Sequence, residues 1–312
     1  MRLDRILALM LVVVCLVAAL GNWLSGTTPS RSAGFGSGLQ QADVALIDVY
    51  GIISDTAAGG FGADDAGANN LIRAVRRARE DEVKAILLRI NSPGGTASAS
   101  QAVYEELMRT RQETDIKIVA SLGDVAASGG YYVASAAEHI VANPATVTGS
   151  IGVIVRTQNV SSLLDKIGVT TSTVQSGQYK DILSPFRDPT ADERALVQGI
   201  VSESYQQFLD AIAAGRDLSI DTLRPLADGR IFTGSQAVTL ELVDSLGNST
   251  DALNKATELA GIDGEPVVRN YSSTFWPGSL GAFLSTTLSE WLPGYQNLKT
   301  AQWNWIPLTL ME

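Results

Sequence analysis

Short apolar runs alternate with amphipathic segments over the first part of the folded region, and this order constrains the fold most strongly. Residues 43–53, 84–90 and 117–122 are runs of the length and composition of buried strands. The segments between them, 69–82 and 97–113, carry apolar side chains at helical spacing. Strands that alternate with helices predict parallel strands joined by crossovers. We therefore expect an α/β fold whose Gly-rich chain turns meet at the carboxyl edge of the sheet, where open α/β sheets build their sites.

The elements that follow are shorter and complete a domain that we expect to span residues 42–262. They are strands at 139–144, 146–155 and 169–177, a short helix at 160–168, a long amphipathic helix at 190–217, and further elements at 229–247 and 249–261. Residues 263–312 differ in kind, because they hold four of the five tryptophans and little charge. We interpret this tail as packing on the domain, with an oligomer interface or membrane contact as alternatives.

The N-terminus predicts a membrane segment at residues 1–24. Ile6–Leu20 is apolar without a break and follows Arg2 and Arg5, which favours a cytoplasmic N-terminus and export of the rest. An uncleaved signal-anchor is the preferred interpretation, because Trp23 suits an interfacial position. Cleavage near residues 19–21 is the alternative, since small residues occur there at the right spacing. The Gly- and Ser-rich residues 25–41 are typical of a flexible linker.

Charge and composition exclude several classes of function. The net charge is −10, which argues against nucleic acid as a partner. The chain has one cysteine, Cys15, and one histidine, His139. An internal disulfide is therefore impossible, and a zinc site built from His and Cys is not expected. No phosphate-binding loop or dinucleotide fingerprint occurs, so we expect no metal or nucleotide cofactor.

The stretch GDVAASGGYYVA, residues 123–134, places Ser128 between a strand and an apparent helix. A serine at such a sharp turn suits a nucleophile, because its hydroxyl is exposed and a helix N-terminus favours nearby negative charge. The same position suits a helix cap. Local sequence alone leaves these two interpretations equally open.

A serine nucleophile needs a base, and the chain offers few. His139 is expected at the far end of the helix that follows Ser128, roughly 15 Å away at 1.5 Å per residue, so it is a poor base. Lys180 lies in QSGQYKDILSPFR among small and apolar neighbours. A neutral amine can accept the proton. Asp181 would stabilise a charged lysine if it faced Lys180, and adjacent residues of an extended segment need not share a side. Without further context, a solvated surface charge is the simpler interpretation of Lys180.

Four stretches in order resemble the signal peptide peptidase A (SppA) family of Ser–Lys membrane peptidases, in its single-domain form. They are INSPGG at 90–95, GDVAASGGYYVA at 123–134, TGSIGVI at 148–154 and SGQYKDILSPFR at 176–187. The resemblance implies a Clp protease/crotonase-type α/β fold of repeated β-β-α and β-α units, with one N-terminal transmembrane helix. It extends through most of residues 43–262 and does not obviously include the tail.

The resemblance also implies roles for individual residues. Ser128 matches the nucleophile and Lys180 the general base. Ser150 matches a serine that orients the lysine amine. The backbone donors of the oxyanion hole match Gly129 and either Gly94 or Gly95.

Substrate, assembly and location follow from the same resemblance. The expected substrates are remnant signal peptides and other unfolded apolar peptides. The expected assembly is a ring-shaped homo-oligomer in which the serine and lysine of one site can come from neighbouring subunits. The expected location is the cytoplasmic (inner) membrane, with the catalytic domain on the outer, periplasmic side. The alternatives are a related peptidase that cleaves a specific, stomatin-type membrane protein, and a non-catalytic scaffold that binds peptides.

Overall fold

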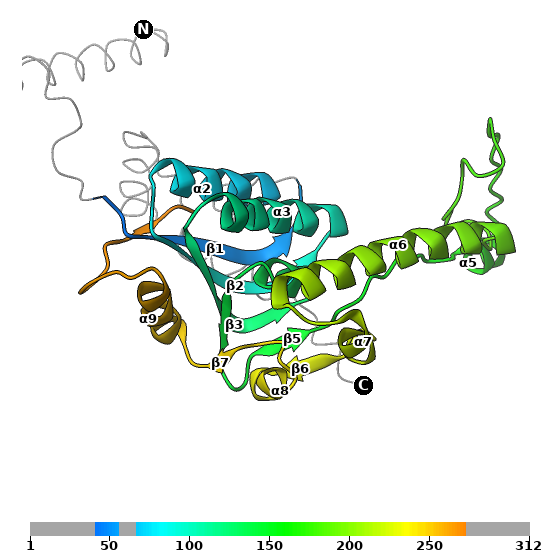
Figure 1. Ribbon diagram of the computed structural model, residues 1–312. Helices are drawn as coiled ribbons and strands as arrows, with labels where there is room; N and C mark the ends of the chain where they lie inside the picture. The colour runs from blue at the N-terminus through cyan, green and yellow to red at the C-terminus, as the bar shows by residue number, and fades with distance from the viewer. Residues whose placement is uncertain (1–40, 56–66, 273–312) are drawn as a thin grey trace, which may run out of the picture. The chain divides into compact units, whose positions relative to one another are not determined.

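The computed structural model describes residues 41–55 and 67–272, and all of these except Gln41 belong to one compact unit (Figure 1). The predicted membrane segment at 1–24, the predicted linker at 25–41 apart from Gln41, and the tail from residue 273 lie outside the described residues. Within the described part, no helix has both the length and the hydropathy needed to span a membrane.

Strands and helices alternate through the first half of this unit, as the sequence predicts. In chain order the first elements are β1 (Val44–Ile53), α2 (Ala68–Glu80), β2 (Ala85–Gly95), α3 (Ala97–Glu113), β3 (Lys117–Ala127), α4 (Gly129–Ala134), β4 (His139–Ala142) and β5 (Val147–Gly149). The later elements are α5 (Ser161–Lys166), α6 (Ala191–Arg216), α7 (Ile220–Leu223), a 3-10 turn η1 (Arg224–Leu226), β6 (Ile231–Thr233), α8 (Gly234–Thr239), β7 (Ser245–Leu246), α9 (Ser249–Leu259) and β8 (Val268–Asn270).

The strands form one sheet in the order β6-β5-β3-β2-β1-β8, with β4 also paired to β3 and β7 to β4. The pairs β1–β2 and β2–β3 are parallel, which confirms the predicted crossovers. Among the described strands, only β5 and β6 pair antiparallel. Residues that follow β2, β3 and β5 therefore meet at one edge of the sheet.

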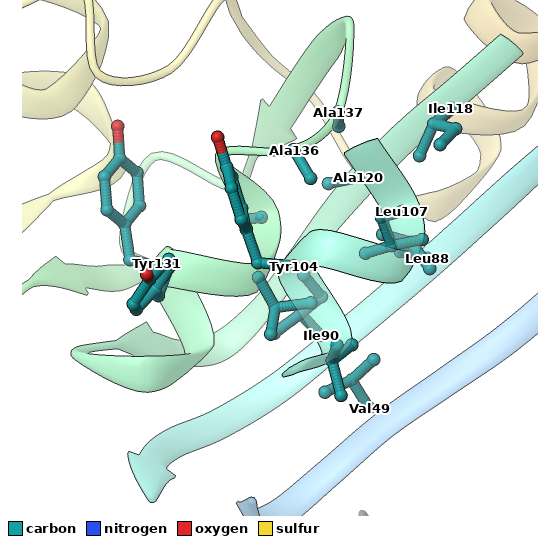
Figure 2. Close-up of a cluster of buried hydrophobic side chains, with 14 of the residues drawn as sticks. Val49, Leu88, Ile90, Tyr104, Leu107, Ile118, Ala120, Tyr131, Ala136 and Ala137 are labelled. Atoms are coloured by element: carbon teal, nitrogen blue, oxygen red, sulfur yellow. The ribbon is translucent and has the colours of Figure 1, made fainter. Parts of the chain in front are cut away.

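Both faces of the sheet are covered, and the side chains of β2 show how. Ile86, Leu88 and Ile90 point into the large core beneath α2, α3 and α4, part of which is drawn in Figure 2. Ala85 and Leu87 alternate with them and pack against α9 on the other face (Figure 1). Because successive residues of a strand point to opposite faces, a strand covered on both faces is apolar at every position. This explains the continuous apolar run at 85–88, which only Arg89, paired with Asp48, separates from Ile90.

Three predicted segments differ from the structure. The NSPGG motif is not a turn, because β2 continues through it and pairs Gly94 and Gly95 with Ile52 and Ile53. Residues 150–155 are not strand, since β5 ends at Gly149. Residues 169–177 also form no strand. Their Thr and Val residues suit a strand, but every residue of this segment is exposed, so no buried face holds it in a sheet.

The sheet also continues past the expected domain end at residue 262. Val268–Asn270 form β8, which pairs parallel with Val44–Leu46 of β1. Tyr271 is buried, and its hydroxyl donates to a carboxylate oxygen of Asp81. Residues 268–270 of the expected tail therefore belong to the sheet.

Residues 154–190 form an arm that stands apart from the sheet, together with the N-terminal half of α6 (Figure 1, green). None of residues 154–190 is buried. The C-terminal half of α6 packs firmly, with Phe208, Leu209 and Ile212 buried in the core. The arm exposes large apolar side chains: Ile154, Val155, Leu163, Ile167, Val169, Val174, Tyr179, Leu183 and Phe186, with Leu196 and Ile200 of α6 beside them.

Two glycines of α6 provide a test of where this helix is packed. A Cβ at Gly215 would overlap the carbonyl group of Ser135, whereas a Cβ at Gly199 would point into open space. We expect Gly215→Ala to lower the free energy of unfolding by about 1–3 kcal/mol through overpacking. Gly199→Ala should raise it by up to about 1 kcal/mol, because alanine favours the helix. Thermal unfolding of both purified variants measures the difference, and equal melting temperatures would contradict the packing described here.

Candidate active site

Ser128 lies where β3 ends and α4 begins, in a backbone conformation that serine rarely adopts. Its φ is 52° and its ψ is −121°. The backbone N–H of Ser128 donates to the carbonyl oxygen of Gly149 at 2.8 Å, and its own carbonyl accepts from Tyr132 N–H at 2.9 Å. The hydroxyl makes no capping hydrogen bond to α4. The helix-cap interpretation therefore finds no support, and the strained, half-buried serine has the character of a functional residue.

The glycines of NSPGG lie directly against Ser128. Gly94 has a φ of +106°, and a Cβ built on it would lie 2.7 Å from the backbone nitrogen of Gly129 and 2.9 Å from Ser128 Cβ. A Cβ on Gly129 would lie 3.0 Å from the backbone nitrogen of Gly95 and would overlap the hydroxyl of Ser100. No side chain fits between these backbones, so glycine is required on both sides.

Hydrogen bonds around Gly94 distinguish between the two expected oxyanion donors of this motif. The Gly94 N–H donates to Ser92 Oγ at 3.1 Å, and that hydroxyl donates to the carbonyl of Gly51 at 2.6 Å. The Gly94 amide is therefore engaged, whereas the Gly95 amide nitrogen faces Gly129, 3.0 Å from a Cβ built on that residue. Of the predicted donors, Gly95 and Gly129 are the pair that this arrangement favours.

Ser92 is a residue that sequence reasoning did not single out. Its side chain is fully buried, and it links the end of β2 to the bulge in β1 after Tyr50. The signal was available in the sequence, because a serine two residues before a glycine can bond to the backbone that follows it.

Ser150 is brought beside Ser128 by strand register. Ala127 of β3 pairs with Gly149 of β5, so the two serines follow paired residues on adjacent parallel strands. Such strands are about 4.8 Å apart. Ser150 also has a left-handed φ of 50°, and its N–H donates to the carbonyl of Arg230 at 2.8 Å. Strand register and this backbone hydrogen bond thus fix the position of the serine that was expected to orient the lysine amine.

Lys180 is not brought to Ser128 within the single chain. It lies on the arm, exposed, with its backbone N–H bonded to the carbonyl of Gly177 at 3.1 Å. In the loop that carries it, Arg187 binds Asp181 and also Glu193 at the start of α6. Farther along α6, Phe208 stacks on Tyr132, four residues after Ser128, with ring centroids 4.6 Å apart. Glu193 lies fifteen residues before Phe208, about 22 Å along the helix axis. The arm therefore holds Lys180 away from the serine of its own chain.

His139 lies too far from Ser128 to serve as its base in the same chain. It pairs with Val119, nine residues before Ser128, roughly 30 Å away at 3.3 Å per residue along a strand. Its Nε2 lies 2.9 Å from Ser245 Oγ, and burial lowers the pKa of its imidazole. This placement agrees with the expectation that His139 is a poor base.

No cluster of three or more His, Cys, Asp or Glu side chains within residues 41–55 and 67–272 is arranged to hold a metal. Two cavities lie away from Ser128. One, of about 660 Å³, opens on the arm beside Asp181, Arg187 and Glu193. The other, of about 260 Å³, lies between the strands and the start of α9, with Arg89 and Asn91 in its wall.

Known proteins match this chain over most of its length. The sequence profile of Peptidase family S49 matches residues 110–263, and that of Clp protease matches residues 60–148. A protein of Enterococcus faecium named as a signal peptide peptidase SppA is 35% identical over 256 residues, which are 81% of this chain and 74% of the relative. A protein of Synechocystis sp. named as a protease is 46% identical over 197 residues, 63% of this chain and 70% of the relative. Protease 4 of Haemophilus influenzae is 32% identical over 272 residues, 86% of this chain and 43% of the relative.

These matches agree with the architecture. The parallel sheet, with helices on both faces, fits the Clp protease/crotonase-like fold that the sequence resembles. The S49 match spans β3, Ser128, Ser150 and the arm, so it covers every expected catalytic residue except the glycines of NSPGG.

The contact between Gly94 and Ser128 can be tested by stability. We expect Gly94→Ala to lower the free energy of unfolding by about 1–3 kcal/mol, because alanine is strained at this φ and meets Gly129. The melting temperature should fall by about 2–4 °C for each kcal/mol lost. Gly152→Ala is the control, since its Cβ would make only ordinary contacts, 3.6 Å from Gly229. An unchanged melting temperature for Gly94→Ala would refute the close approach of the two backbones.

Proposed function

Because the chain belongs to the signal peptide peptidase A family of serine-type peptidases, we propose that it is an endopeptidase with a Ser128–Lys180 dyad. The observation that carries this proposal is the strained position of Ser128 against Gly94, beside the backbone of Gly95 and Gly129, with a hydroxyl that caps no helix. A preorganised pair of backbone N–H groups beside a serine is what acyl transfer requires.

The chemistry follows from these positions. A neutral Lys180 amine takes the proton of Ser128 Oγ as that oxygen attacks a peptide carbonyl. The N–H groups of Gly95 and Gly129 donate to the oxyanion of the tetrahedral intermediate. The lysine ammonium then protonates the leaving amine. Water, activated by the same amine, resolves the acyl-enzyme and releases the serine.

Lys180 reaches a serine from a neighbouring copy in this proposal. The loop that carries it is tied to Glu193, about 22 Å along the helix axis from Phe208 in the packed half of α6. The arm also exposes large apolar side chains such as Ile154 and Val174, the latter 99% exposed. Apolar side chains gathered on one projecting segment favour burial against another protein surface. A second copy that covers the arm satisfies both features, and a closed ring of copies repeats the same contact at each interface.

Family membership supports the proposed substrate and location. The Enterococcus faecium relative is named as a signal peptide peptidase, and this supports cleaved signal peptides and other unfolded apolar segments as substrates. An extended peptide can approach the NSPGG backbone closely because glycines line it. We propose that residues 1–24 anchor the protein in the cytoplasmic membrane, with the peptidase domain on the outer side, where signal peptide remnants remain in the bilayer.

Substitution of Ser128 tests the nucleophile. We expect Ser128→Ala to lower kcat for a fluorogenic apolar peptide by about 1,000-fold or more, because no other group can form the acyl-enzyme. The control is Ser235→Ala on the exposed surface of α8, away from the arm, which should retain full activity. Peptides that accumulate in membranes containing Ser128→Ala identify the substrates. A single accumulated membrane protein, with no signal peptides, would favour the narrower peptidase instead.

Mixed oligomers test the source of the lysine. Ser128→Ala and Lys180→Ala are each expected to be inactive alone. If the dyad joins two copies, random assembly of equal amounts restores about a quarter of the sites, because each needs one intact serine and one intact lysine from different chains. Peptidase activity of the co-assembled variants is the measurement. A mixture as inactive as its components would place both groups in one chain, and full activity of Lys180→Ala alone would rule out the dyad.

A further inference from the structure

Arg187 on the arm holds two carboxylates with one guanidinium group. Its Nε donates to Asp181 Oδ2 at 2.9 Å, and its Nη2 donates to Asp181 Oδ1 at 2.7 Å. On the other side, its Nη1 donates to Glu193 Oε2 at 2.8 Å, and its Nη2 also contacts Glu193 Oε1. Both oxygens of Asp181 are therefore engaged in the fork geometry that arginine provides and lysine cannot.

Glu193 fixes this cluster to the start of α6. Its side chain is only 2% exposed. It accepts the Thr190 N–H at 2.8 Å, and Thr190 Oγ1 accepts the Glu193 N–H at 3.2 Å, which completes a capping box. The Arg187 guanidinium lowers the pKa of Glu193 to about 2 and lowers the pKa of Asp181 below its usual value. Both carboxylates therefore stay ionised and bound to Arg187 near neutral pH.

Asp181 follows Lys180 directly, and this makes its orientation important. A carboxylate that faces a lysine stabilises the charged ammonium and removes the base. In the described part of the chain, the Lys180 amine pairs with no carboxylate, whereas Asp181 is turned toward Arg187 and α6. The charged groups of this cluster are Asp181, Arg187 and Glu193, and Arg187 accounts for the orientation of Asp181.

We propose that Arg187 is a positioning residue for Lys180. It holds Asp181 against the start of α6, so that this carboxylate cannot pair with the lysine amine. It also fixes the loop that presents the amine. The inference rests on the proposed function of Lys180 as base, and it adds a residue that touches neither the nucleophile nor the oxyanion donors.

The test compares Arg187→Gln with the double variant Arg187→Gln/Asp181→Asn in the full-length protein, assayed with a fluorogenic apolar peptide between pH 6 and 10. We expect Arg187→Gln to lower kcat near neutral pH by about 10-fold, because a rise of one unit in the pKa of the base leaves about a tenth as much neutral amine. Its KM should stay within about twofold, because Arg187 does not bind substrate. The acid limb of its pH–rate profile should move up by roughly one pH unit, since the released Asp181 carboxylate favours the protonated amine.

The double variant separates positioning from folding. Removing the charge of Asp181 should return the acid limb to the wild-type pH, even if the loop is less ordered. Arg109→Gln is the matched control, because it breaks an arginine–carboxylate pair with Glu106 on α3 and should leave the profile unchanged. Melting temperatures identify any variant that fails to fold, and Arg187→Lys, which keeps the charge, then replaces Arg187→Gln and should show a smaller shift in the same direction.

The outcomes distinguish this inference from the proposed function. Full activity of Lys180→Ala would overturn the dyad itself. An inactive Lys180→Ala with an unshifted acid limb in Arg187→Gln would overturn only the role of Arg187. An acid limb that shifts equally in the single and double variants would assign the effect to loop disorder and would also overturn it.

Discussion

The parallel pairing of β2 with its neighbours beyond the bulge at Ile90 is the interaction on which the site depends. The register between β2 and β3 shifts between Ile90 and Ser92, so β2 continues as a strand toward Gly95 instead of turning away. This brings two glycine backbones into contact with Ser128 and Gly129. The strain at Ser128 persists because the carbonyl of Gly149 and the start of α4 hold it from both sides.

The apolar runs and the helical spacing of apolar residues predicted the central sheet well, because each strand and helix there shows its own pattern in the sequence. Helix 97–113 has the predicted bounds, and the parallel order of the first three strands is confirmed. NSPGG misled the prediction because proline and glycine favour turns, whereas pairing with Ile52 and Ile53 overrides that preference. For residues 169–177 the error was the reverse, because a strand was predicted and none forms. Strand propensity alone is not enough when the segment has no buried face and no partner strand.

The candidate site was predictable only in part. The strand order places Ser128 and a Gly-rich segment at one edge, and register adds Ser150, but the assignment of Lys180 came from resemblance. Ser92 and Arg187 went unnoticed because their roles depend on which backbone or carboxylate the fold brings to them. Ser92 binds Gly94 and Arg187 binds Asp181, which are both near in sequence. The sequence does not show which of several nearby polar groups each side chain will bind.

The unequal packing of α6 has a mechanical consequence. One half of this helix is clamped by Phe208 and its neighbours, and the other half carries the arm beyond the core (Figure 1). A tilt of about 5° about the clamped half would move Glu193 by about 2 Å, given its distance of about 22 Å along the axis. Such a displacement is comparable to the difference between a hydrogen bond and no contact. A small rotation of α6 about its packed C-terminal half would therefore shift the whole arm, including Lys180.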